Sequence, residues 1–398
     1  MVLPNLYLRR RQERRVQLGH PWVFSNEVAI ERSPLTAFEP GDCVNVMSHS
    51  GKPLGTAYVN PHSLISARML SRETDRPLDS TLLGPRLAHA LALRETLGWL
   101  PDCRLVYAES DHLPGLIVDR FADVLAVQIG TAGMERVRDE IVTSLVELCS
   151  PAAVVLRNDV ASRALEGLAS YVEVAYGEVP PVVGLRENGA RFEISPLEGQ
   201  KTGWYYDHRS NRARLSARAE GRSVLDCFSY VGGFGVQAAL GGAQSVLCLD
   251  SSQSALEWVA HNAELNGVAG QVDVRRGDVF DSLRALRGEE RRFDIVIVDP
   301  PAFMRRKKDR RAGLEAYRRL NRRAMQVLED DGLLLSASCS FHLSADEHQN
   351  LLSGAAGDLG RWIQILERGH QGADHPVHPG LSESEYLKAL LVRVCRDE

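Results

Sequence analysis

The sequence lacks several features that mark particular classes of protein. No stretch approaches 18 consecutive uncharged apolar residues, so we expect no membrane-spanning helix. The first 15 residues, MVLPNLYLRRRQERR, are charged and have no apolar core of the kind that a secretory signal needs. With 44% hydrophobic and 25% charged residues and no low-complexity tract, the composition is typical of a soluble globular protein. A chain of 398 residues predicts two or three domains.

Cysteines are few and are not arranged in pairs. The seven lie at positions 43, 103, 149, 227, 248, 339 and 395, an odd number without CxxC spacing. This argues against a disulfide framework or a zinc site and suits a reducing cytoplasm. His370, His375 and His378 have no carboxylate-histidine spacing of the metalloenzyme kind, so we expect a loop at the rim of an active site and no bound metal.

Positive charge is concentrated in three segments, although the net charge is −5. Residues 1–16 contain five arginines against one acid, residues 201–222 contain six basic residues against two acids, and residues 304–323 contain ten against two. The rest of the chain is therefore acidic. Basic segments on an acidic body favour binding of a polyanion if they converge in space, whereas each segment alone is equally typical of a solvated helix face.

Hydrophobic periodicity predicts three domains, at residues 1–70, 71–188 and 189–398. The first has short strand patterns at Cys43–Met47, Leu54–Val59 and Ile65–Leu70, separated by turn signals, and predicts a small β-barrel or sandwich. The second combines strand patterns with a helix expected at Met134–Leu148 and is expected to be α+β.

The third predicted domain alternates strands and helices. Its apolar strand patterns lie at Val224–Phe228, Ser245–Leu249, Val272–Arg275, Ile295–Val298 and Leu333–Ala337. A basic helix is expected at Leu314–Leu328. The alternation predicts an α/β fold with a parallel, doubly wound sheet, in which a ligand binds beyond the carboxyl ends of the strands.

The ends of the first three strands of this domain predict a cofactor site. A turn rich in glycine, residues 228–235, leads from the first strand into a helix, and Asp226, Asp250 and Asp278 lie at the ends of successive strands. The G-x-G-x-x-G pattern of dinucleotide enzymes is absent, and Asp226 suits an ammonium group better than a pyrophosphate. We therefore expect S-adenosylmethionine as the cofactor. The candidate cofactor-binding residues are Asp226, Phe228, Ser229, Tyr230, Gly232, Gly233, Asp250, Ser251, Asp278, Val279 and Asp299.

The fourth and fifth strands end in candidate catalytic residues. Asp299 precedes Pro300 and Pro301, which make a stiff loop, and Cys339 follows the fifth strand among serines rather than inside an apolar run. A thiolate that adds to carbon 6 of a pyrimidine makes carbon 5 able to attack a sulfonium methyl group, while a carboxyl group at N3 neutralises charge on the ring. Cys339 and Asp299 fit these two roles, and nearby basic residues would favour the thiolate. The base that removes the carbon 5 proton is not identified, and the target base must be unpaired or flipped.

These motifs resemble one family over nearly the whole chain. Asp226 with SYVGGFG, the DPPAF sequence at 299–303, Ser338-Cys339-Ser340 and the segment 200–212 are similar to the bacterial large-subunit rRNA (cytosine-5)-methyltransferase I family. Residues 19–29, 40–42 and 54–58 look like the PUA domain of that family, residues 108–121 like its central domain, and residues 374–376 like its C-terminal loop.

The resemblance implies a PUA-like RNA-binding barrel, a central α+β domain and a Rossmann-like class I methyltransferase domain. It also implies that Cys339 is the single nucleophile and that the product is 5-methylcytosine in rRNA. The family has Gln and Glu where His208 and Ser210 stand here, which leaves the target nucleotide open. A homodimer is also left open. Candidate substrate-binding residues are Arg209, Arg212, Pro300, Pro301, Phe303, Arg305, Arg306 and Arg318, with the segments Arg305–Arg311 and Tyr317–Arg323 as sources of phosphate contacts.

Three alternatives stay open at this point. A uracil-5 RNA methyltransferase uses the same chemistry, but that family usually has Asn-Pro after its cysteine, where this chain has Ser340-Phe341. An amino-methylating enzyme needs an aromatic residue directly after its Pro-Pro, where Ala302 stands here, and gives Cys339 no role. A non-catalytic RNA-binding assembly factor would not need both Cys339 and Asp299.

Overall fold

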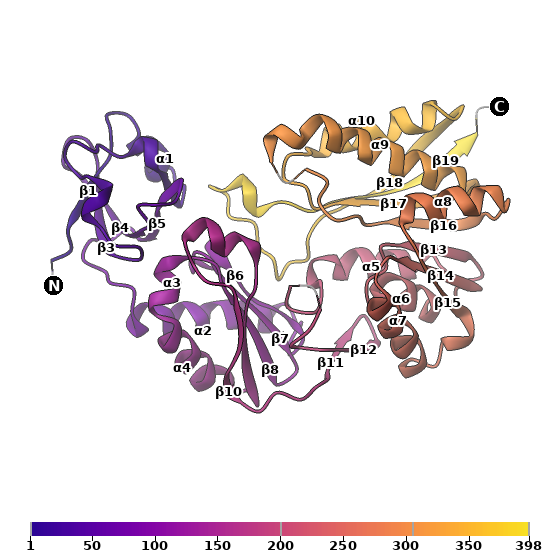
Figure 1. Ribbon diagram of the computed structural model, residues 1–398, viewed down its shortest axis with the longest axis horizontal. Helices are drawn as coiled ribbons and strands as arrows, with labels where there is room; N and C mark the ends of the chain where they lie inside the picture. Colours follow the sequence, from indigo (N-terminus) through magenta and orange to yellow (C-terminus); the bar gives the residue numbers. More distant parts are fainter. Residues whose placement is uncertain (1, 200, 305, 397–398) are drawn as a thin grey trace. The chain divides into compact units, whose positions relative to one another are not determined.

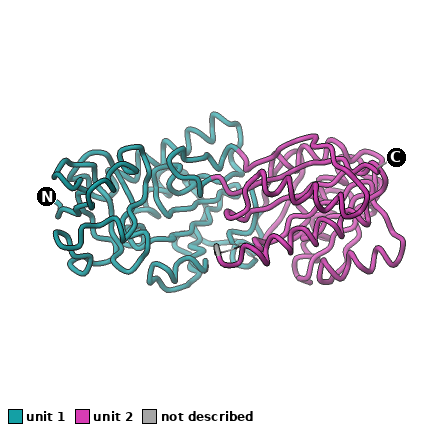
Figure 2. The backbone as a smooth tube through the Cα atoms, turned by 90° about the horizontal axis from the view of Figure 1, so that it is seen from above, with its two compact units in different colours: residues 1–183, 195–206, 373–384 teal, residues 184–194, 207–372, 385–398 magenta. Residues whose placement is uncertain are grey.

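The computed structural model describes residues 2–199, 201–304 and 306–396. The chain divides into two compact units, one of residues 1–183, 195–206 and 373–384, and the other of residues 184–194, 207–372 and 385–398 (Figure 2). Each unit is therefore built from segments that are distant in sequence. The three predicted domain ranges stay a prediction. In the described residues, no helix is long and apolar enough to cross a membrane.

Unit 1 begins with a five-stranded sheet in the order β1-β3-β4-β5-β2. Its strands are β1 (Asn5–Tyr7), β2 (Trp22–Phe24), β3 (Cys43–Met47), β4 (Pro53–Val59) and β5 (Ile65–Ser71), and α1 (Glu13–Gln17) lies between β1 and β2. The buried side chains of this sheet are mostly valine, leucine and alanine, which suit a pleated sheet with one face in the core. The three strands expected in this region are confirmed, to within a residue at each end.

A second five-stranded sheet follows in unit 1, in the order β10-β9-β8-β7-β6. Its strands are β6 (Cys103–Tyr107), β7 (Leu116–Phe121), β8 (Val124–Ile129), β9 (Ala153–Asn158) and β10 (Tyr171–Gly177). Its helices are α2 (Ser80–Thr96), α3 (Ala132–Arg136) and α4 (Arg138–Cys149). The single helix expected at Met134–Leu148 is wrong in one respect, because the backbone leaves helical geometry at Val137 (φ −111°, ψ 27°) and divides it into α3 and α4.

Unit 2 contains a seven-stranded sheet in the order β15-β14-β13-β16-β17-β19-β18, after a short hairpin of β11 (Val183–Glu187) and β12 (Ala190–Ile194). The sheet strands are β13 (Ser223–Cys227), β14 (Ser245–Asp250), β15 (Val272–Arg276), β16 (Phe293–Val298), β17 (Leu328–Ser338), β18 (Arg361–Gly369) and β19 (Lys388–Arg396). The first five in spatial order are parallel, and β19 runs antiparallel to both β17 and β18. The predicted parallel sheet is confirmed, and the antiparallel edge is an addition to it.

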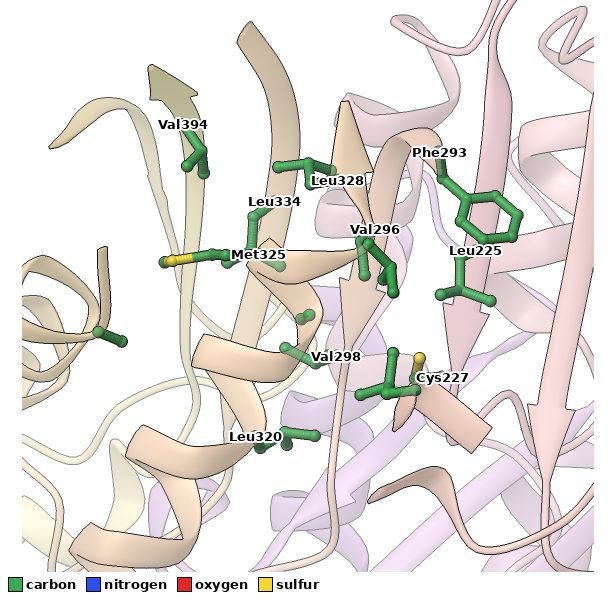
Figure 3. Close-up of a cluster of buried hydrophobic side chains, with 14 of the residues drawn as sticks. Leu225, Cys227, Phe293, Val296, Val298, Leu320, Met325, Leu328, Leu334 and Val394 are labelled. Atoms are coloured by element: carbon green, nitrogen blue, oxygen red, sulfur yellow. The ribbon is translucent and has the colours of Figure 1, made fainter. Parts of the chain in front are cut away.

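Helices cover both faces of this sheet (Figure 1). They are α5 (Arg209–Ser216), α6 (Gly233–Leu240), α7 (Gln253–Leu265), α8 (Val279–Gly288), α9 (Arg310–Gln326) and α10 (Ala345–Gly357). Apolar side chains of α8, α9 and α10 pack on one face against β13, β16 and β17, and Figure 3 shows this core around Leu225, Val296 and Leu334. Helix α9 begins and ends earlier than the expected Leu314–Leu328. It ends earlier because Leu328 already pairs with Phe293 as the first residue of β17.

Candidate active site

The carboxyl ends of the parallel strands bring most of the predicted site residues to one edge of the unit 2 sheet. In the strand register Asp226 of β13 pairs with Cys248 of β14 on one side and with Ile297 of β16 on the other. Val298, which precedes Asp299, pairs with Ser336 of β17. The same edge therefore carries Asp226, Asp250, Asp299 and Cys339, as their positions after successive strands predicted.

The turn between β13 and α6 has an unusual backbone. Phe228 (φ 63°), Tyr230 (φ 49°) and Gly232 (φ 87°) all lie in the left-handed region, which two of these residues enter without being glycine. Such a conformation persists where surrounding contacts hold it, and it is enriched at ligand-binding turns. Gly235, in the first turn of α6, has no room for a side chain, because a Cβ atom would lie 2.5 Å from the Cys248 sulfur.

Asp226 is a buried carboxyl group at the start of this turn. Its side chain is 1% exposed, and its Oδ2 atom accepts a hydrogen bond of 2.9 Å from the backbone N–H of Gly235. Burial raises the pKa of Asp226 to about 7, and the charges of Asp299 and Asp250 add to this effect against the hydrogen bond from Gly235. A cationic ligand at this edge would relieve the repulsion among the three carboxyl groups.

The second and third strand ends contribute two more predicted carboxylates. Asp250 orders the turn after β14, because its two oxygens accept hydrogen bonds from the backbone N–H groups of Tyr230 (3.0 Å) and Ser252 (2.9 Å). Asp278 caps the N-terminus of α8 by accepting a hydrogen bond from the N–H of Asp281 (3.1 Å). Of the neighbours predicted with them, Ser251 is exposed and Val279 is buried in the core.

Asp299, half-buried after β16, faces a histidine that precedes α5. The Nε2 atom of His208 lies 3.3 Å from Asp299 Oδ2, and the ring of His208 is almost fully buried. Burial by itself would lower the pKa of His208, but the charge and hydrogen bond of Asp299, with the charge of Asp207, outweigh it and raise this pKa above 6.5. On the other side of the ring, Nδ1 lies 3.2 Å from the amide nitrogen of Asn211. His208 and Asp299 therefore form a pair in which the carboxyl group favours the protonated imidazole.

Cys339 is half-buried, and hydroxyl groups order the loop that carries it. Ser338 Oγ donates to Tyr317 Oη (2.9 Å), and Tyr317 Oη lies 2.8 Å from Ser340 Oγ. Ser340 Oγ also accepts from the backbone N–H of Met304 (3.3 Å), in the loop after Pro301. These contacts join the loop of Asp299 to that of Cys339 through α9, so the two predicted catalytic residues belong to one hydrogen-bonded framework.

Lys388, the first residue of β19, was not singled out from the sequence. It pairs with Ser338 across the antiparallel ladder, and its Nζ atom donates hydrogen bonds of 2.7 Å to the carbonyl oxygens of Ser340 and Tyr386. The available signal was weak: a lysine at the start of an apolar strand near the end of the chain.

Two of the predicted substrate-binding arginines are engaged within unit 2. Arg212 Nη1 lies 2.7 Å from Glu187 Oε1, and Arg209 Nε lies 3.6 Å from Glu187 Oε2. All three side chains are buried, and the Arg212 guanidinium group lies 5.5 Å from the centre of the Phe234 ring. These contacts hold the β11–β12 hairpin to α5.

The loop after Asp299 and the start of α9 carry the other predicted substrate-binding residues. Pro300 is buried, Pro301 is exposed, and the Phe303 ring packs 4.8 Å from that of Tyr317. Arg306 is exposed and pairs with Asp309 (3.2 Å). Arg318 is also exposed, and Asp358 accepts two hydrogen bonds from it (3.1 and 2.7 Å). Arg305 lies outside the described residues.

The histidine-rich C-terminal segment makes contacts of its own. His375 Nδ1 lies 2.8 Å from Asp374 Oδ1 in unit 1, and His378 packs edge-on against His112. Across residues 2–199, 201–304 and 306–396, no group of three or more His, Cys, Asp or Glu side chains is arranged to hold a metal ion.

Comparison with protein families gives two matches in this chain. Residues 6–72 match a PUA-like domain, and residues 152–393 match the S-adenosylmethionine-dependent methyltransferase family. The chain is also similar to curated proteins along its full length. It is 38% identical to Ribosomal RNA large subunit methyltransferase I of Shewanella denitrificans over 393 residues, which cover 97% of this chain and 98% of that protein. The protein of the same name from Tolumonas auensis is 39% identical over 98% of both chains.

Solved structures show the same fold along the whole chain. A Streptococcus mutans protein described as a SAM-dependent methyltransferase superposes with a TM-score of 0.83 and 21% identity, covering 98% of this chain and 100% of that one. The methyltransferase SMU.776, complexed with SAH, has a TM-score of 0.84, also with 21% identity, and covers 99% and 100%. These likenesses establish the expected fold class, with an N-terminal PUA-like domain and a class I methyltransferase domain.

Proposed function

The chain belongs to the ribosomal RNA large subunit methyltransferase I family of S-adenosylmethionine-dependent methyltransferases, and from this premise we propose that it methylates carbon 5 of a cytosine in large-subunit rRNA. The observation that carries the proposal is that Cys339 and Asp299 follow adjacent parallel strands at the edge where Asp226 and Asp250 also lie. This arrangement gives one sheet edge a nucleophile, a carboxylate and a set of acids suited to a cationic cofactor.

The cofactor is S-adenosylmethionine, and this edge fits its chemistry. We propose that Asp226 holds the ammonium group of the methionine part, because its buried carboxyl group is repelled by two other acids and gains most from a cation. Asp250 would accept hydrogen bonds from the ribose hydroxyls, and Asp278 would accept one from the adenine amine. When bound, the cofactor supplies an electrophilic methyl group on a sulfonium centre.

The proposed reaction assigns bond making and breaking to Cys339, carbon 6, carbon 5 and the methyl donor, and the carbon 5 proton leaves to solvent. The Cys339 thiolate forms a bond to carbon 6, and N3 takes up a proton from the His208–Asp299 pair, so that the ring becomes a neutral enamine. This proton returns to the pair when the thiolate leaves. Carbon 5 then forms a bond to the methyl carbon while the methyl–sulfur bond breaks. Loss of the carbon 5 proton returns its electron pair to the ring, which expels the thiolate. We assign no residue to that last proton transfer.

His208 has a positioning part in this scheme. Its Nε2 atom lies 3.3 Å from Asp299 Oδ2, and this contact fixes the direction of the carboxyl group. Asp299 can then accept a hydrogen bond from the N4 amine of cytosine or from a protonated N3. The family pattern has glutamine at this position, which can orient the carboxylate without carrying charge.

We propose that RNA contacts come from two surfaces, one in each unit. Exposed arginines of α9, among them Arg311, Arg319 and Arg322, would contact phosphates in unit 2. In unit 1, a cleft of about 1240 Å³ is lined by Lys52, Arg72 and Arg86 together with histidines. Its acidic lining residue, Asp111, is already bound by Arg94 through two hydrogen bonds, so the cleft favours an anion.

The test is to identify the methylated nucleoside. The full chain is incubated with large-subunit rRNA and S-adenosylmethionine carrying a labelled methyl group, and the digested RNA is analysed by mass spectrometry. We expect labelled 5-methylcytidine with the wild-type protein and none with Cys339→Ala, which should still bind the cofactor. Labelled 5-methyluridine would instead establish the uracil-5 alternative, and an N-methylated base made equally well by Cys339→Ala would exclude this mechanism.

A covalent intermediate provides a second test. RNA that contains 5-fluorocytidine cannot lose fluorine from carbon 5, so the adduct between carbon 6 and the thiol should accumulate. We expect a denaturation-resistant protein–RNA complex that requires Cys339. If wild type and Cys339→Ala both form no such complex and no methylated RNA, the assembly-factor alternative is supported.

A further inference from the structure

Lys388 occupies a place that the proposed mechanism leaves without a role. It begins β19, lies opposite Ser338 in the antiparallel ladder, and is therefore next to the loop that carries Cys339. The two hydrogen bonds from its ammonium group, to the carbonyl oxygens of Ser340 and Tyr386, hold a positive charge beside this loop. An ammonium group carries three N–H bonds, so these contacts account for two of them.

The electrostatic neighbours of Lys388 and Cys339 come from several elements of unit 2. Burial lowers the pKa of Lys388 to about 8, against the charges of Cys339 and Glu385, which favour the ammonium form. Burial also raises the pKa of Tyr317, on α9, and the charge of Cys339 adds to this effect. On α10, burial lowers the pKa of His348 to about 3, and the charge of Lys388 acts in the same direction.

These directions identify Lys388 as a cation near Cys339. At neutral pH Tyr317 keeps its proton and His348 is neutral. Compared with Tyr317 and His348, Lys388 is therefore the group that carries positive charge beside this loop. A cation next to a thiol stabilises the thiolate and makes it available as a nucleophile.

We propose that Lys388 is a positioning residue that keeps Cys339 a thiolate at neutral pH and fixes the loop of Ser340 that presents it. This inference rests on the proposed function in assigning the thiolate a catalytic purpose, but the charge interaction itself requires no RNA and no methyl transfer. The proton lost by the Cys339 thiol passes to solvent, or to the Lys388 amine when that group is neutral, and no bond to Lys388 forms.

The first experiment titrates Cys339 in the full chain without cofactor or RNA. The rate of alkylation of Cys339 by iodoacetamide is measured between pH 5 and 10 by mass spectrometry of its peptide. We expect Lys388→Met to move the midpoint of the profile upward by about one pH unit, which lowers the rate near pH 7 about tenfold. Lys388→Arg should keep most of the wild-type profile because it keeps the charge.

Arg284→Met is the matched control, because it removes one positive charge from an exposed side chain of unit 2 that has no part in the proposed site. It should leave the Cys339 profile unchanged. A Lys388→Met protein that unfolds at the same temperature as wild type and shows the same alkylation profile would overturn the proposal, since a purely structural lysine would not move a thiol titration.

A reciprocal measurement covers the case in which Lys388→Met does not fold. Lys388 is acylated with acetic anhydride across the same pH range in wild type and in Cys339→Ser. Because the interaction is mutual, removing the thiolate should lower the midpoint of Lys388 labelling, and an unchanged midpoint would overturn the proposal.

The two proposals fail separately. A shifted Cys339 profile in Lys388→Met, combined with a product other than 5-methylcytidine, keeps the charge interaction and removes the proposed reaction. Formation of 5-methylcytidine together with an unshifted Cys339 profile in Lys388→Met keeps the proposed reaction and removes the charge interaction.

Discussion

In the central sheet region of unit 1, buried charges meet matched partners, whereas at the strand ends of unit 2 the buried Asp226 carboxyl group is exposed to the negative charges of two other carboxyl groups. Arg94 is fully buried and makes hydrogen bonds of 2.7 and 2.8 Å to the two oxygens of Asp111, and Arg104 makes bonds of 2.6 and 2.9 Å to Asp119. In unit 2, the charges of Asp299 and Asp250 both help to raise the pKa of the buried Asp226.

The difference shows how the same residue types serve two purposes. A bidentate arginine–carboxylate pair satisfies both charges internally, so it fixes one arrangement of the fold and has little left for a ligand. A buried carboxyl group with a raised pKa, such as that of Asp226, costs free energy when it ionises in the folded protein, and a cationic ligand recovers that cost on binding. The charge pairing therefore assigns stability to the first region and binding to the second.

The largest effect that this comparison predicts is on folding. Arg94→Met should destabilise unit 1 by about 3–5 kcal/mol, because it leaves the Asp111 carboxylate buried without its partner. Urea denaturation measures this loss, and Arg94→Met with Asp111→Leu should recover most of it. The exposed pair of Arg284 and Asp281 supplies the control, and Arg284→Met should cost less than about 1 kcal/mol. Equal losses of unfolding free energy in Arg94→Met and Arg284→Met would contradict the distinction between buried and exposed pairs.

Replacement of a strand-end carboxyl group should weaken ligand binding while it stabilises the fold, in contrast to Arg94→Met. Asp226→Asn should weaken binding of S-adenosylhomocysteine about 10- to 100-fold, because it removes a charge-assisted interaction with the ammonium group. The same change should raise the melting temperature of the ligand-free protein at pH 8. The folded-state pKa of about 7 lies above the usual 3.8, so the stability that Asp226 contributes at low pH is lost as the pH rises from about 4 to 7. Titration calorimetry and thermal unfolding measure both effects, and wild-type affinity in Asp226→Asn would refute the assignment.

In the wild-type protein, titration of the Asp226 carboxyl group should make cofactor binding depend on pH. Below pH 7 the Asp226 carboxyl group is protonated and must lose its proton to meet the ammonium group. Affinity for S-adenosylhomocysteine should therefore fall about tenfold between pH 8 and pH 6, and proton release should accompany binding at the lower pH. Calorimetry in buffers of different ionisation enthalpy measures the released proton. The dependence should flatten in Asp226→Asn, and an equally steep curve in that variant would place the titrating group elsewhere.

The sequence predicted the features that follow from one strand and the turn after it. Strand patterns and their final residues placed Asp226, Asp250, Asp299 and Cys339 at one sheet edge, because parallel strands end on the same side. Contacts that depend on distant pairing were not predictable in this way. His208 meets Asp299 across 91 positions, and Lys388 reaches Ser340 because β19 inserts between β17 and β18. For Arg209 and Arg212, sequence alone gave charge but no sign of the buried Glu187 that binds them.

The smallest predicted effect concerns RNA binding by α9, where paired arginines can be compared with unpaired ones. Arg310 and Arg318 are paired with Glu347 and Asp358, whereas Arg311 and Arg322 are exposed and have no carboxylate partner among the ion pairs of the described residues. If α9 binds single-stranded phosphates, replacing Arg311 and Arg322 together by glutamine should reduce the slope of log affinity against log salt by about 1.4.

The matched variant replaces Arg310 and Arg318 by glutamine and removes the same number of positive charges from the same helix. Its effect on the salt slope should be smaller, because each of these arginines must first leave an acidic partner before it can release counterions from RNA. Binding isotherms of large-subunit rRNA fragments between 50 and 200 mM salt distinguish the two variants. Equal slopes would mean that α9 responds to total charge alone, and an unchanged slope in both would move the phosphate contacts to the cleft of unit 1.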